Sequence, residues 1–155
     1  MNDPEPEILM TTLPIPHVGL EVLDEHECFR LLRACHLGRV ALSLGALPAV
    51  FPVHYALLGR DPVFRTDAGA KLTAASAGNV VCIEIDDADP ESHGGWSVMV
   101  TGPADVLTDE ADLAQAKDLP LRPWVGRGDA FVRIKAAVVS GRRISPPHPD
   151  GRGDH

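Results

Sequence analysis

Short apolar segments separated by turn residues make up most of this sequence, and they restrict the chain to a β-rich fold. Three such segments follow one another at residues 39–44, 49–58 and 63–66. Gly45–Pro48 and Gly59–Pro62 lie between them, which predicts a meander of antiparallel strands. Further strands are predicted at 79–86, at 95–109 and at 130–144. A bend is expected at Gly102–Pro103. Closing these six strands into a small barrel would remove their exposed edges.

The predicted helices are short. Asp24 is a good N-cap, and Glu27 three residues later completes a capping-box pattern. We expect this first helix to end at Leu37–Gly38, where glycine is a common stop signal. Two further helices are predicted at 67–76 and 109–117. The fold class is therefore mainly β with short helices.

The chain has 155 residues, which is the size of one domain. Residues 1–19 contain four prolines and are expected to form an extended arm. Residues 146–155 are rich in proline and glycine and are expected to form a flexible tail. This leaves residues 20–145 as a single folded domain.

Composition argues against several kinds of partner. The formal net charge is −8 and aromatic residues are only 5% of the chain, so we expect neither a nucleic-acid surface nor a membrane-binding face. No segment reaches the ~18 apolar residues of a membrane-spanning helix, and the N-terminus does not resemble a signal peptide. Three cysteines without a close pair are typical of a reducing compartment. These features predict a cytoplasmic protein.

One segment has the composition of an anion site. Arg65, Thr66 and Lys71 surround a small-residue turn that follows a strand and precedes a helix. Backbone N–H groups in such a turn, together with two cationic side chains, can hold a phosphate. The alternative is that Arg65 and Lys71 are solvated surface charges. The usual nucleotide-binding, serine-hydrolase and zinc-protease motifs are missing from the sequence.

The order of segments resembles the pyridoxamine 5′-phosphate oxidase-like family of split β-barrels. The similarity runs from Val22 to Ile144. It is carried by Leu37–Ala41, Pro48–Tyr55, Phe64–Thr66, Gly69–Leu72, Val80–Asp86, Trp96–Gly102 and Gly141–Ile144. The resemblance implies a homodimer that holds FMN, without a covalent link, in a cleft between subunits.

The same resemblance implies which residues contact the cofactor. Those expected along the isoalloxazine ring are Phe51, Pro52, Val53 and His54. Those expected around the phosphate are Arg65, Thr66, Lys71 and Leu72. Trp96 and Ser97 are expected beside the flavin, a position that the other subunit of a dimer can supply. The C-terminal Arg142–Ser145 lacks the Arg-x-His pair of the oxidase itself, so oxidation of vitamin B6 is not expected.

The expected function is that of an FMN-dependent oxidoreductase acting on a small molecule, with a reduced nicotinamide or the substrate as hydride source. The alternatives are a deazaflavin-dependent reductase and a non-catalytic flavin or haem binder, with His54 or His93 as haem ligands. His54 has a second reading as a hydrogen-bonded core residue. Trp124 is expected at an interface. No catalytic residue is predicted, and the acidic residues 84–91 are interpreted as a solvated turn without a metal.

Overall fold

The computed structural model describes residues 19–146 of the chain. The predicted arm up to residue 18 and the predicted tail from residue 147 lie outside the described residues. The elements are β1 (Leu20–Val22), α1 (Glu25–Ala34), β2 (Leu37–Leu44), β3 (Leu47–Leu58), β4 (Asp61–Thr66), α2 (Ala70–Ser76), β5 (Val80–Ala88), β6 (Gly95–Val106), α3 (Glu110–Lys117), β7 (Ala130–Ile134) and β8 (Val138–Ile144).

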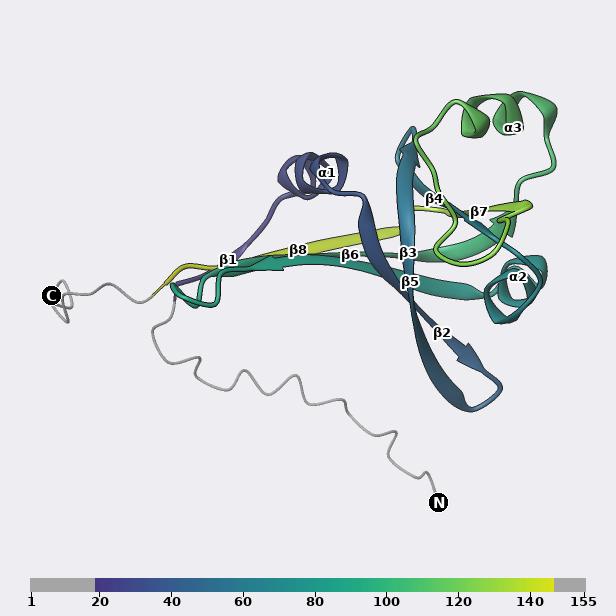
Figure 1. The fold of residues 1–155 in the computed structure, drawn as a ribbon. Coiled ribbons are helices and arrows are strands. Elements are labelled where there is room, and N and C mark those ends of the chain that lie inside the picture. Colours follow the sequence, from purple (N-terminus) through teal and green to yellow (C-terminus); the bar gives the residue numbers. More distant parts are fainter. Residues whose placement is uncertain (1–18, 147–155) are drawn as a thin grey trace, which may run out of the picture.

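The strands form an antiparallel barrel (Figure 1). Its neighbours run in the order β6, β5, β2, β3, β4 and β7, and a pairing between β7 and β6 closes the ring. Strands β8 and β1 continue the sheet beyond β6, outside that ring. The predicted fold, a mainly β split barrel of six antiparallel strands with short helices, is confirmed.

The predicted strand at 130–144 is wrong in one respect, because it is interrupted. β7 pairs with the second half of β6 and β8 pairs with the first half. At the interruption residues 135–137 lie opposite only two residues, Gly102 and Pro103, so the ladder contains a bulge. The bend predicted at Gly102–Pro103 therefore falls where both strands turn from the extended sheet into the barrel.

The first helix starts as predicted but ends earlier. The Asp24 carboxylate accepts a hydrogen bond of 2.8 Å from the backbone N–H of Glu27. The helix ends at Ala34, and Leu37–Gly38 already belong to β2, so the predicted glycine stop is wrong. Gly38 pairs with Val53, and a Cβ at this position would lie 3.1 Å from the Ile83 side chain. The glycine is needed for close packing within the sheet.

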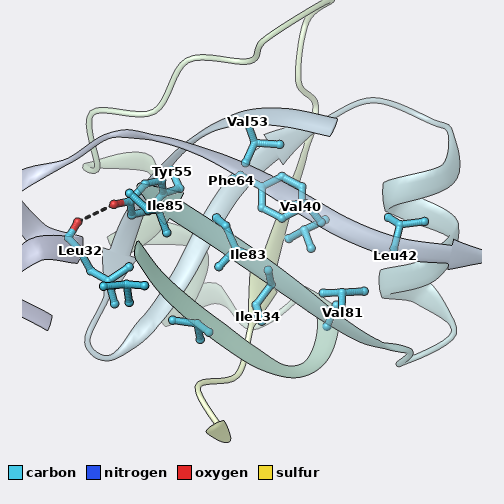
Figure 2. Close-up of a cluster of buried hydrophobic side chains, with 14 of the residues drawn as sticks. Leu32, Val40, Leu42, Val53, Tyr55, Phe64, Val81, Ile83, Ile85 and Ile134 are labelled. Carbon is cyan, nitrogen blue, oxygen red and sulfur yellow. Dashed lines mark hydrogen bonds between the residues drawn. The ribbon is translucent and has the colours of Figure 1, made fainter. Parts of the chain in front are cut away.

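The core fixes which residues of β3 face outward. Val53 and Tyr55 are buried with Phe64 of β4 and with the aliphatic side chains of β2 and β5 (Figure 2). The Tyr55 hydroxyl donates a 2.7 Å hydrogen bond to the carbonyl of Leu32 in α1, and burial raises the pKa of this tyrosine. Because side chains alternate along a strand, Pro52 and His54 lie on the outer surface of the barrel.

Within residues 19–146, no helix is long and apolar enough to cross a membrane.

Candidate functional site

A pocket beside β3 brings together three of the residues predicted to contact a cofactor. It has a volume of about 360 Å³ and is lined by Phe51, residues 66–71 and Val125. We call it the Lys71 pocket. Phe51 comes from β3, Thr66 ends β4, and Lys71 lies in the first turn of α2. The β3–β4 hairpin and the turn that follows it therefore place these side chains around one cavity, which joins two residues expected at a phosphate, Thr66 and Lys71, with one expected along the ring, Phe51.

Lys71 is a cation in a poor environment for its charge. Burial lowers the pKa of its ammonium group, and its Nζ lies 5.0 Å from the centre of the Phe51 ring. Within residues 19–146, no carboxylate oxygen lies within 4.0 Å of the Lys71 nitrogen. A half-buried ammonium whose neighbour is an aromatic face gains from an anionic partner.

Arg65, the second predicted phosphate contact, faces elsewhere. Its Nε donates to the carbonyl of Gly128 at 2.9 Å, and its Nη2 donates to the carbonyl of Arg127 at 3.2 Å. The guanidinium also lies 5.4 Å from the centre of the Phe131 ring. Arg65 does not line the Lys71 pocket. Leu72 is half-buried and packs against the core.

The predicted ring contacts on β3 divide between its two faces. The Val53 side chain is buried in the core, so only its backbone can reach a ligand. His54 is half-buried on the outer surface, which contradicts its reading as a core histidine. Its ring is stacked on that of His36, with 6.1 Å between centroids, and lies 5.2 Å from the ring of Trp124.

Trp96 and Ser97 line a different pocket. This Trp96 pocket has a volume of about 460 Å³ and includes His93 and Arg142. Trp96 lies near the start of β6, and two strands, β5 and β2, separate β6 from β3. With neighbouring strands about 4.8 Å apart, one chain does not bring Trp96 to the Lys71 pocket. The predicted cofactor contacts therefore form two groups in the single chain.

Sequence reasoning missed the environment of Glu84, which was grouped with a solvated acidic turn. Glu84 lies within β5, half-buried, and Arg39 Nη1 is 3.7 Å from its Oε2 and 3.5 Å from Oδ2 of Asp86. Burial raises the pKa of Glu84 to about 7, the neighbouring Asp86 adds to the rise, and Arg39 opposes it. The alternation of side chains along β5 is the sequence pattern that indicates this environment, since Glu84 follows Cys82 on the outer face.

Across residues 19–146, no three His, Cys, Asp or Glu side chains are grouped as metal ligands would be.

The raised pKa of Glu84 predicts how stability depends on pH. The folded chain keeps this carboxyl protonated up to about pH 7, whereas the ordinary value is 4.5. The contribution of Glu84 is therefore fully present below pH 4.5 and is lost as the pH rises through 7. Solvent screening at this partly exposed site reduces the loss to about 1 kcal/mol.

Glu84→Gln removes this titration. Urea unfolding at pH 5 and pH 8, with protein concentration fixed, should show a smaller loss of stability in the variant than in the wild type. Equal losses in the two proteins would contradict the assigned pKa.

Comparison with known proteins places the chain in a family. Residues 24–143 match the family described as pyridoxamine 5′-phosphate oxidase. The uncharacterized protein Rv0080 of Mycobacterium tuberculosis is 40% identical over 128 residues, covering 79% of this chain and 84% of that protein. The structure of an FAD binding protein from Mycobacterium smegmatis has 38% identity and a TM-score of 0.69, covering 79% of this chain and 98% of the other. An FAD-binding protein from Mesorhizobium loti has 26% identity and a TM-score of 0.68, covering 81% and 99%. The chain belongs to the pyridoxamine 5′-phosphate oxidase family.

Proposed function

We propose that this protein binds a flavin nucleotide in the Lys71 pocket and uses it as an oxidoreductase for a small molecule. The observation that carries the proposal is the half-buried Lys71, which lines a pocket of phosphate-binding composition and has no carboxylate within 4.0 Å among residues 19–146. Two similar solved structures are named as FAD-binding proteins, which supports a flavin as the ligand.

Each group around the pocket has a part in this proposal. Lys71 and the Thr66 hydroxyl would hold the phosphate, supported by backbone N–H groups of the turn at 67–70. Phe51 and the outer edge of β3 through His54 would lie along the isoalloxazine ring. We propose FMN as the flavin, and FAD would bring the same phosphate with an adenylate added. A bound flavin supplies hydride transfer between a reduced nicotinamide or substrate and an acceptor.

A homodimer would complete the site. A row of small and apolar side chains crosses the outer face of five neighbouring strands, from β8 to β3, in register: Val138, Thr101, Cys82, Ala41 and Val50. Val138 and Val50, at the two ends of this row, are 61% and 62% exposed. Apolar rows of this kind favour association with a second copy. Such pairing can bring the Trp96 pocket of one subunit toward the Lys71 pocket of the other.

The three cysteines are free thiols, which fits a cytoplasmic location.

The experiment that tests the proposal is reconstitution. Purified protein is incubated with FMN, FAD or riboflavin, freed of excess ligand, and examined by visible spectroscopy. Mass analysis of the molecule released on denaturation then identifies it. We expect a flavin spectrum with one flavin per chain and a dimer in light scattering. Protein that stays colourless with all three ligands would contradict the proposal. A deazaflavin or a haem in the released fraction would replace the flavin by one of the alternative cofactors.

A further inference from the structure

A segment without helix or strand joins α3 to β7 (Figure 1). We call residues 120–129 the Trp124 loop. Its Val125 lines the Lys71 pocket, and the Trp124 ring lies 5.2 Å from that of His54, tilted by 45°. Trp124 is 47% exposed and Val125 is 77% exposed. Two large apolar side chains are therefore presented to solvent where the flavin ring is expected.

Asp67 is the first anchor of this loop. Its carboxylate accepts hydrogen bonds from the backbone N–H of Arg127 at 2.9 Å and of Asp129 at 3.1 Å. These N–H groups hold the pKa of Asp67 below its usual value. Gly126 has φ +76°, and a Cβ there would overlap the Asp67 carboxylate. The loop backbone therefore passes directly against Asp67, which a side chain at residue 126 would prevent.

Arg65 is the second anchor. Its two hydrogen bonds go to the carbonyls of Gly128 and Arg127, so its charge is directed at the loop backbone. Arg65 and Asp67 flank Thr66, which itself lines the pocket. One three-residue stretch at the end of β4 thus builds a wall of the pocket and fixes the loop that carries Trp124.

We propose that Trp124 packs on the isoalloxazine ring of the bound flavin, and that Arg65 and Asp67 are positioning residues that hold Trp124 there. This inference rests on the proposed flavin function. An indole has few rotatable bonds, and here its loop is fixed before the ligand arrives, so packing on a flat conjugated ring costs little conformational entropy. Arg65 then acts through the loop and not through the phosphate.

The test compares ligands with and without a phosphate. FMN, FAD and riboflavin are titrated into wild type, Trp124→Ala and Arg65→Ala at one salt concentration. Trp124→Ala should weaken all three about 10-fold, because stacking involves the ring that they share. Arg65→Ala should show the same pattern, including the loss for riboflavin. If Arg65 binds the phosphate, riboflavin affinity will stay unchanged and only FMN and FAD will weaken, which overturns the positioning role. Arg122→Ala, an exposed arginine of the same loop, is the control for charge and should bind as wild type does.

Two more measurements separate positioning from a general loss of structure. In Arg65→Ala combined with Trp124→Ala, riboflavin affinity should equal that of Trp124→Ala alone, whereas additive losses would overturn the link between the two residues. Trp124→Phe leaves Trp96 as the only tryptophan, so at saturating riboflavin the quenching of tryptophan fluorescence should be stronger in wild type than in this variant. Equal quenching in the two proteins would overturn the packing, and this readout holds even if Arg65→Ala does not fold. Wild type that binds no flavin would contradict the proposed function itself, while normal binding by Trp124→Ala would overturn only this inference.

Discussion

Replacing Lys71 by alanine should weaken the binding of FMN and FAD about 30-fold while riboflavin affinity changes less than about threefold. The lost interaction is a charge-assisted contact worth about 2 kcal/mol, which corresponds to that ratio. The contact is specific to phosphate, so riboflavin, which has none, should be nearly unaffected. Lys71 suits this role because it is half-buried, its pKa is lowered by burial, and its nitrogen lies over the Phe51 ring.

Isothermal titration at fixed ionic strength measures these affinities. Lys117→Ala in α3 is a matched control, since it removes the same charge from an exposed position outside the Lys71 pocket. The control variant Lys117→Ala and the phosphate-free ligand riboflavin together distinguish a local contact from a change in overall charge. If Lys71→Ala loses riboflavin and FMN equally, the phosphate does not lie at Lys71. If it loses neither, the flavin binds elsewhere.

Replacing Gly102 by alanine should reduce the free energy of unfolding by about 3 kcal/mol, at the upper end of the cost of overpacking. Here β6 passes from β8 to β7, and its backbone runs against the bulge at residues 135–137. A Cβ on Gly102 would overlap the carbonyl oxygen of Lys135 and would lie 2.9 Å from its carbonyl carbon. Backbone atoms on both sides cannot move aside as a flexible side chain would, so the barrel must distort.

Urea unfolding at one protein concentration tests this prediction, because association would make the midpoint depend on concentration. Gly19→Ala is the matched control. Its added methyl group would meet Ser145 at an ordinary 3.4 Å, and its cost should stay within about 0.5 kcal/mol. A Gly102→Ala protein as stable as the control would show that the close approach of the two strands is not required.

Local patterns in the sequence predicted the barrel well. Strand spacing, turn residues and the Asp24 cap depend on neighbours within a few positions, and the structure has them in place. The two errors involved glycines and bends whose purpose is a contact with a distant strand. Gly38 packs against Ile83 within the sheet, and the interruption at 135–137 faces Gly102 on β6. A single sequence does not say which distant backbone a glycine will meet.

The candidate site was predictable in part for the same reason. Phe51, Thr66 and Lys71 lie close to one hairpin and its following turn, so their grouping around one pocket follows from local order. The partners of Arg65 are more than 60 residues away, in the loop before β7, and spacing gave no hint of them. Trp124 was predicted as an interface residue, and its place beside His54 depends on the same distant loop.

A crystal structure of the protein with FMN tests the central claim most directly. We expect the phosphate within hydrogen-bonding distance of Lys71 Nζ and the Thr66 hydroxyl, with the ring between the outer edge of β3 and Trp124. We also expect Trp96 of the partner subunit at the same flavin. A flavin held in the Trp96 pocket of one chain, with the Lys71 pocket empty and Lys71 still without an anionic partner, would contradict the account.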